Sequence, residues 1–227
     1  MSPRTHAQRG LTMIELLIGM AIGLFIVAAA ASLLTGNLRE NRNLLIESRL
    51  MQDLRTAADM ITRDLRRAGY WAAATTGVRG DGTGVVMANP YTEVTPIGAP
   101  ADSTSFRFSR DATENNTVDS NEQFGYRLRN GAIELQLGTG NWQALTDANT
   151  LTVSEFSVTP TVEEISLASF CANPCPAGSA ATCPPRQLVR SLAVVVSGRA
   201  TGDARLTRSV RSQVRLRNDP IVGTCPA

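Results

Sequence analysis

The strongest pattern along the chain is an apolar run near its N-terminus that contains one acidic residue. From Leu16 to Leu34 no side chain is ionisable, whereas Glu15 immediately precedes this stretch. Counted from Leu11, the run would form a helix roughly 36 Å long, which is enough to cross the hydrocarbon core of a bilayer. The pattern therefore predicts a transmembrane helix over residues 11–35, with a carboxylate close to its start.

The pattern beyond Gly36 predicts that this helix continues as an amphipathic helix over residues 36–69. Apolar residues recur there at spacings of three, four and seven, while charged residues lie largely off the stripe. Gly69 is suited to a helix C-terminus. The stripe fits either a face packed on the chain's own domain, which we favour, or a coiled-coil seam. Its members are Leu44, Met51, Leu54, Ala58, Ile61, Leu65 and Ala68.

Strand patterns dominate the remainder of the chain, residues 70–227. Apolar residues alternate with polar ones on both sides of Asn130-Gly131, which is a turn pair typical of a two-residue hairpin. One register sets Arg127 opposite Glu134 and places the apolar pairs together on the other face. These pairs are Leu128 with Ile133, Tyr126 with Leu135, and Phe124 with Leu137.

Further strands are expected in the same region, with at most one more, Val85–Ala88, in a loop-rich passage before them. The sequence thus predicts an α+β fold, in which a long N-terminal helix packs on a C-terminal antiparallel β-sheet domain. In the last strand Arg211, Arg215 and Arg217 share a face. Such a face is more often solvated than a docking site for an acidic neighbour. The expected strands are Ser105–Ser109, Leu151–Thr159, Leu188–Ser197 and Leu206–Arg217.

Charge and composition argue against an enzyme and against nucleic-acid binding. All 22 basic residues are arginines and the net charge is only +2, so no strongly basic surface is expected. The single histidine, His6, lies before the apolar run, and no catalytic set or cofactor site is recognisable. Arg4 and Arg9 also precede the run, which favours a cytoplasmic N-terminus and a periplasmic domain.

Four cysteines lie in the C-terminal part of the chain, at Cys171, Cys175, Cys183 and Cys225. Their spacings are not those of a zinc ribbon or finger. In an oxidising compartment they predict two disulfides that pin a Pro-rich loop or tie down the C-terminal tail. Three pairings are possible, and the sequence does not choose among them.

The segment from Asp111 to Glu122 has the length of a calcium-binding loop but lacks some of its required residues. Asp stands first and Glu last, whereas Thr113 occupies the third place and Asn116 the place of the turn glycine. No flanking helices are expected. We therefore interpret the segment as a solvated loop and expect no metal site.

The residues around Glu15 carry a resemblance to a known family. The motif begins with Gly10, continues with the apolar Leu11 and with Thr12, and has a glutamate, Glu15, as the fifth residue after the glycine. Together with the long apolar run that follows, it resembles a type IV prepilin leader. The resemblance implies that a prepilin peptidase cuts between Gly10 and Leu11, that residues 1–10 are the leader, and that Leu11 is methylated. The usual residue at that position is Phe. It also implies that Glu15 neutralises the amino terminus of a neighbouring subunit, although its own amino terminus, one helical turn away, is an alternative.

Two further segments narrow the resemblance. The segment Arg63-Asp64-Leu65-Arg66-Arg67-Ala68-Gly69-Tyr70 resembles the PilW group of minor pilins and, less closely, the minor pseudopilin GspJ. Arg215-Leu216-Arg217-Asn218 is a pattern shared by both groups. The resemblance implies a non-enzymatic subunit of the inner membrane that joins other minor pilins and the major pilin. Such subunits prime pilus assembly and are linked to the pilus tip, adhesion and twitching motility.

Three other interpretations remain open. A minor pseudopilin of type II secretion has the same leader and helix, and a membrane-tethered periplasmic binding protein has the same anchor. A cleaved secretory signal, with small residues from Ala28 to Ser32, is disfavoured because Glu15 would lie inside its apolar core. Glu15 could also lie close to the membrane interface, with its side chain extended to the lipid headgroups.

Overall fold

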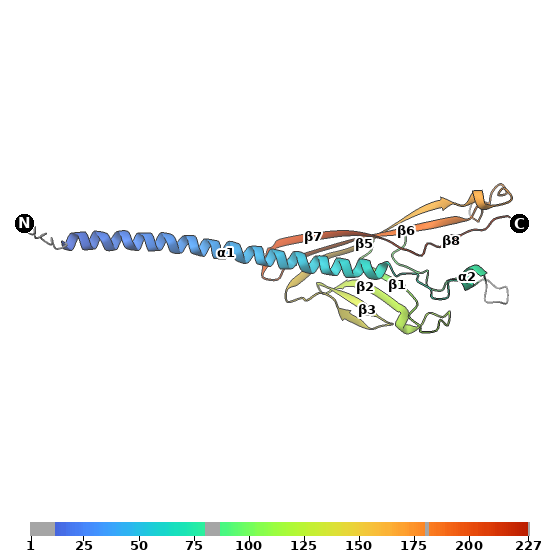
Figure 1. Ribbon diagram of the computed structural model, residues 1–227, viewed down its shortest axis with the longest axis horizontal. Coiled ribbons are helices and arrows are strands. Elements are labelled where there is room, and N and C mark those ends of the chain that lie inside the picture. The colour runs from blue at the N-terminus through green and yellow to red at the C-terminus, as the bar shows by residue number, and fades with distance from the viewer. Residues whose placement is uncertain (1–11, 80–86, 180–181, 227) are drawn as a thin grey trace, which may run out of the picture. The chain divides into compact units, whose positions relative to one another are not determined.

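The computed structural model describes residues 12–79, 87–179 and 182–226 of the chain (Figure 1). The chain divides into two compact units, residues 1–46 and residues 47–227. Helix α1, Met13–Leu65, contributes to both units, and all strands belong to the second. This arrangement of one long helix and antiparallel strands confirms the predicted α+β class.

In the first unit, α1 carries large apolar side chains that the described part of the chain leaves exposed. By length and composition, this helix contains a segment that is able to cross a membrane. The exposed residues run from Met13 through Leu34 and include Leu38, Leu44 and Leu45 beyond the apolar run. A bilayer removes such surface from water, so the exposure is consistent with a membrane anchor.

In the second unit, α1 buries the apolar stripe that the sequence predicts. Leu54, Ala58, Ile61 and Leu65 are all fully buried. The helix ends at Leu65 rather than at Gly69, because hydrogen-bonded turns take over: the N–H of Ala68 donates to the carbonyl of Leu65 at 3.1 Å. The predicted packing on the chain's own domain is therefore correct for this half of the stripe, whereas Leu44 in the first unit is exposed.

The first sheet, sheet A, contains four antiparallel strands in the order β1-β2-β3-β4. The hairpin of β2 and β3 has the predicted register, with Leu128 opposite Ile133 and Arg127 opposite Glu134. Asn130 and Gly131 both have positive φ, 51° and 74°, as a type I′ turn requires. The strands are β1 Ser103–Arg107, β2 Gln123–Arg129, β3 Ala132–Leu137 and β4 Trp142–Ala144.

The second sheet, sheet B, is built from longer strands in the order β5-β6-β7, with β8 pairing with β6. The four bounds are β5 Leu151–Ser166, β6 Arg186–Ala200, β7 Asp203–Arg215 and β8 Ile221–Val222. The short strand predicted at Val85–Ala88 lies partly outside the described residues, and Met87 and Ala88 are not in a strand. The remaining elements are short: α2 Thr76–Arg79, η1 Ser120–Glu122 and η2 Ala168–Phe170.

Both sheets pack on the segment of α1 that belongs to the second unit. From sheet A, Tyr126 reaches Asp64 of the helix. From sheet B, Gly198 leaves room for Leu54, because a Cβ at residue 198 would lie 3.3 Å from the leucine side chain. The sequence predicts one sheet, whereas the strands form two. The apolar face of α1 is wide enough to contact both sheets. Its buried residues are Leu50, Leu54, Ala57, Ala58, Ile61 and Leu65.

Candidate functional site

The N-terminal end of α1 is closed by reciprocal hydrogen bonds between Thr12 and Glu15. The backbone N–H and the hydroxyl of Thr12 donate to Oε2 of Glu15, at 3.0 and 2.9 Å. The backbone N–H of Glu15 lies 3.4 Å from the hydroxyl oxygen of Thr12, to which it donates. This is a capping box, a Thr followed three residues later by Glu, in which each side chain satisfies the other's backbone N–H.

The capping box fixes where the carboxylate of the apolar segment lies. Glu15 is held at the first turn, where the unpaired N–H groups of a helix create a partial positive charge. The predicted leader, residues 1–10, and the predicted first mature residue, Leu11, lie outside the described residues, so cleavage and methylation stay predictions. The Thr-x-x-Glu spacing is a recognisable capping signal, and in this chain it coincides with Thr12 and Glu15 of the leader motif.

The two segments that suggested a minor pilin meet in space, and we call this contact the motif junction. Asn218 of the C-terminal segment donates from Nδ2 to the carbonyl of Ala68 at 3.1 Å. Gly69 has φ +75°, and a Cβ on it would lie 3.1 Å from Cβ of Asn218. A glycine therefore satisfies both the left-handed backbone and the close approach of Asn218.

Other residues of the motif junction attach the end of α1 to sheet A. The hydroxyl of Tyr126 donates to Oδ2 of Asp64 at 2.6 Å. The guanidinium of Arg67 lies over the ring of Phe108, 4.1 Å from its centroid. The N–H of Gly69 donates to the carbonyl of β1's last residue, Arg107, at 2.8 Å. These conspicuous motif residues thus hold the helix to its domain, which is an architectural role.

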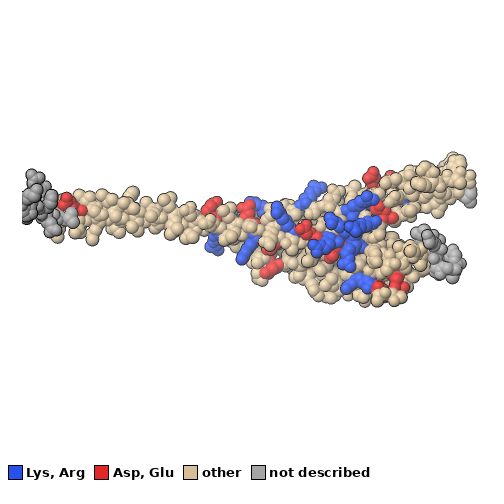
Figure 2. Space-filling view, in the orientation of Figure 1, with Lys and Arg blue, Asp and Glu red and all other residues tan. Residues whose placement is uncertain are grey.

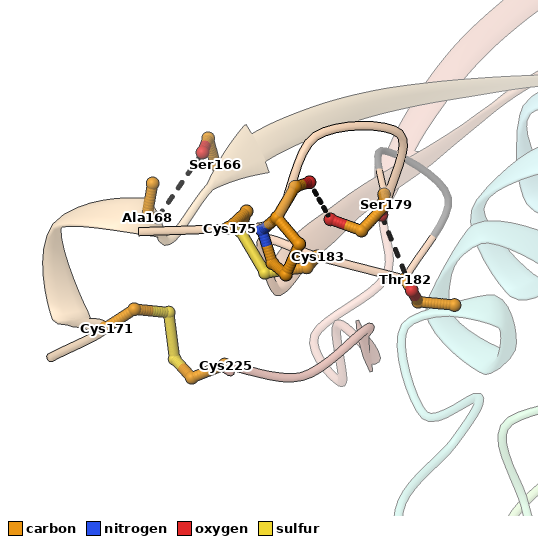
Figure 3. The surroundings of a disulfide bond; sticks show 9 residues. Ser166, Ala168, Cys171, Cys175, Ser179, Thr182, Cys183 and Cys225 are labelled. Carbon is orange, nitrogen blue, oxygen red and sulfur yellow. Dashed lines mark hydrogen bonds between the residues drawn. A yellow bond between two sulfur atoms is a disulfide. The ribbon is translucent and has the colours of Figure 1, made fainter. Parts of the chain in front are cut away.

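The four cysteines form two disulfides, as the sequence predicts (Figure 3). One joins Cys171 to Cys225 and the other joins Cys175 to Cys183. The first ties the C-terminal tail to the loop between β5 and β6, and the second closes a small ring within that loop. The sequence left three pairings open, and the structure selects this one.

Acidic side chains gather at the loop from Asp111 to Glu122. Carboxylate oxygens of Asp111, Asp119 and Glu122 lie within 4.8 Å of one another. Burial, and then the charge of Glu122, raise the pKa of Asp111 above its ordinary value. Asn116 adopts φ +59°, so it occupies the place of the turn glycine in a left-handed conformation. No metal was expected here, and that expectation stays a prediction.

The oxygens of Glu122 already accept hydrogen bonds from the chain. Oε1 accepts from the N–H of Arg110 at 2.7 Å, and Oε2 accepts from the N–H of Asp119 at 2.9 Å. The hydroxyl of Tyr91 also lies 3.0 Å from Oε2. Glu122, which is fully buried, therefore has a structural role in closing the loop.

The arginines that the sequence predicts on one face of the last strand are exposed, although β7 ends at Arg215 and Arg217 lies just beyond it. Arg211, Arg215 and Arg217 are exposed, whereas Val214 and Leu216, between them in sequence, are buried. Figure 2 shows basic side chains concentrated in the part of the second unit where α1 and β7 run.

A capped apolar helix that continues into a domain of antiparallel sheets is the organisation of a type IV pilin-like protein. The chain belongs to the prepilin peptidase-dependent protein B family, whose model matches residues 43–216. A model of the prokaryotic N-terminal methylation motif matches residues 5–31, which include Gly10, Leu11 and Glu15. No curated protein and no solved structure matches the chain. The predicted pilin-like class is confirmed. The family's description and the leader motif imply dependence on prepilin peptidase.

Proposed function

We propose that the chain is a minor type IV pilin of the PilW kind, a structural subunit without enzymatic activity. In this proposal prepilin peptidase cuts after Gly10, and Leu11 becomes the methylated first residue. The apolar part of α1 anchors the subunit in the inner membrane, and the second unit lies in the periplasm. The subunit then joins other minor pilins and the major pilin, primes pilus assembly and reaches the cell surface at the pilus tip, where adhesion and twitching motility depend on it.

The observation that carries the proposal is the carboxylate of Glu15, held at the first turn of α1 by Thr12. An acidic side chain inside hydrocarbon costs about 2.5–3.5 kcal/mol on insertion scales. Pairing with an ammonium group offsets that cost, because attraction between opposite charges is strong where water is excluded. A methylated amine at Leu11 of a neighbouring subunit supplies such a group, and it exists only in an assembly.

The first experiment determines the mature N-terminus. Intact-mass and peptide mass spectrometry of the chain purified from membranes should find Leu11 as the first residue, carrying one methyl group. A chain that instead begins near Ala31 or Ser32 would identify a cleaved secretory signal and refute the proposal.

The second experiment separates a pilin from a tethered binding protein. Glu15→Ala should be processed and inserted normally but should lose co-purification with partner pilins. Glu40→Ala, at an exposed glutamate of α1 beyond the apolar run, is the matched control and should retain it. If Glu15→Ala assembles like the wild type, the charge-pairing argument fails.

A third comparison separates the pilus from type II secretion. Deletion of the gene should abolish surface pili and twitching and leave secretion of exported enzymes intact. The reverse result would identify a minor pseudopilin, which has the same leader and helix.

A further inference from the structure

One face of β5, β6 and β7 points away from α1, and we call it the outer face of sheet B. On this face the positive and the negative side chains lie on different strands. The β7 column is basic, the β5 column is acidic, and the β6 column between them is neutral from Gln187 to Ser197. The charged side chains of both columns are exposed. The basic residues are Arg205, Arg211 and Arg215 of β7 and Arg217 just beyond its end, and the acidic residues are Glu155 and Glu163. Arg215 already pairs with Asp219 at 2.9 Å, so Arg205, Arg211 and Arg217 carry the charge argument.

Within one chain the two columns do not neutralise each other. Glu163 lies opposite Val189 of β6. Beyond the end of β7 the pairing with β6 continues for one residue, because the N–H of Leu216 donates to the carbonyl of Arg190 at 3.0 Å. Arg217 therefore lies opposite Val189, on the side of β6 away from β5. Two strand spacings, about 10 Å, therefore separate the backbones of Glu163 and Arg217. Among the described residues, neither side chain takes part in an ion pair.

We infer that the outer face of sheet B binds the same face of a second copy of this chain, about a two-fold axis parallel to β6. Rotation about such an axis exchanges the two sides of the face, so each basic column meets the acidic column of the other copy. Glu163 of one copy then faces Arg217 of the other, and symmetry repeats this pair. The face is thus complementary to itself in charge.

The direction of α1 supports the same axis. Arg208 of β7 forms an ion pair with Glu47 at the start of the helical segment 47–65, and Asn218 bonds to Ala68 just beyond its end. The segment and β7 therefore run in the same direction. An axis parallel to the strands keeps the N-terminal ends of both helical segments at one end of the dimer, as two chains anchored in one membrane require.

The alternative two-fold axis, which crosses the strands within the plane of the interface, fails on both counts. It would reverse the direction of one helical segment relative to the other. It would also place the basic column of one copy on the basic column of the other, which repels. Charge and direction therefore select the same arrangement independently.

The size of the face indicates a weak dimer. Three strands are roughly 14 Å wide, and ten residues extend roughly 34 Å, which gives about 480 Å² per copy. Twice that area is at the lower end of specific interfaces, where complexes are transient. Confinement of both copies to one membrane raises their effective concentration and favours pairing. The centre of the face, on β6, carries Val189, Ala193 and Val195, which association would shield from water.

Cross-linking at the axis tests the geometry. All four native cysteines are in disulfides, so the cysteine of an Ala193→Cys variant is the only free thiol. We expect a short bismaleimide to convert the full-length variant in membranes to a covalent dimer, and Ser191→Cys, the next outward residue on β6, to behave alike. Gln143→Cys, at an exposed position of β4 in sheet A, is the control and should stay monomeric. Monomers from both β6 variants, or an equal dimer yield from the control, would overturn the inference.

Charge exchange tests the identity of the partner. In the Ala193→Cys background, Arg217→Glu and Glu163→Arg should each lower the cross-linked fraction roughly fivefold, because both symmetric pairs become repulsive. Co-expression of the two variants should restore it, since every facing pair in the mixed dimer is again opposite in charge. An effect of Arg217→Glu alone, without restoration, would mean that another acidic partner docks here and would overturn the second-copy assignment. If neither Arg217→Glu nor Glu163→Arg changes the cross-linked fraction, the second-copy assignment is overturned as well.

Discussion

Tyr126 of β2 donates its hydroxyl hydrogen to Oδ2 of Asp64, in the last turn of α1, at 2.6 Å and across 62 residues of sequence. The tyrosine is fully buried, so its hydroxyl needs a partner within the protein. A carboxylate is a strong acceptor, and this one belongs to the segment that resembles minor pilins. The acid of that segment therefore fixes the end of the helix to sheet A.

Removal of this hydroxyl should weaken the second unit. We expect Tyr126→Phe to lower the free energy of unfolding by about 2 kcal/mol, because a hydrogen bond to a charged group is lost. Urea unfolding of the full chain in detergent, followed by tryptophan fluorescence, measures the change. Tyr70→Phe is the control, since Tyr70 is half exposed and should cost little. Equal losses from the two variants would contradict the assigned role.

The same pair should make stability depend on pH in the alkaline range. Burial, and then the hydrogen bond to Asp64, raise the pKa of Tyr126 above its ordinary value. Because the pKa is raised in the folded state, the stabilisation is complete below about pH 10, the ordinary tyrosine pKa, and is lost as the pH rises toward the folded pKa. The free energy of unfolding should therefore fall above about pH 10. In Tyr126→Phe the fall should be smaller, and an identical slope in both proteins would refute this origin.

Local patterns in the sequence predicted the parts of the fold that local chemistry determines. Asn130-Gly131 predicted the turn and the register of the hairpin because both residues adopt positive φ readily. Alternation predicted which face of β7 carries the arginines, since successive strand residues point to opposite faces. The helix end was predicted less well: α1 stops at Leu65, and turns extend the chain to Gly69.

The relationships that the sequence did not predict join distant segments. Neither the bond between Tyr126 and Asp64 nor that between Asn218 and Ala68 has a periodic signature. The division of the strands into two sheets depends on how both cover one helix. Disulfide pairing is undetermined by spacing, because four cysteines allow three pairings. The capping box of Thr12 and Glu15 differs from these long-range contacts, because the Thr-x-x-Glu spacing is a local signal in the sequence.

The two disulfides should differ in what they contribute to stability. Cys171 and Cys225 are 54 residues apart, whereas Cys175 and Cys183 are 8 apart. Loop-closure entropy predicts losses of about 4 kcal/mol for the long loop and about 2.5 kcal/mol for the short one. We therefore expect Cys171→Ser/Cys225→Ser to unfold at lower urea concentration than Cys175→Ser/Cys183→Ser. The opposite order would show that folded-state contacts of the small ring matter more than chain entropy.

The acidic loop offers a test in which removal of a charge should stabilise the protein. Burial, followed by the charges of Glu122, Asp119 and Glu114, raises the pKa of Asp111. A carboxyl group whose folded pKa is raised contributes stability below its ordinary pKa of about 3.9, and this contribution is lost as the pH rises through the folded pKa. At neutral pH the ionised Asp111 therefore opposes folding.

Asp111→Asn should accordingly raise the Tm at pH 7, and the gain should vanish as the pH falls below about 4, where the wild-type carboxyl is also neutral. Asp102→Asn, at an exposed aspartate outside the acidic loop, should leave the Tm nearly unchanged.

Thermal unfolding with and without added calcium distinguishes repulsion from metal binding. Repulsion alone predicts the same gain in both conditions, because no ion is needed to fold the loop. A loss of Tm for Asp111→Asn that occurs only in calcium would identify the three clustered carboxylates as ligands and refute our expectation that the loop binds no metal.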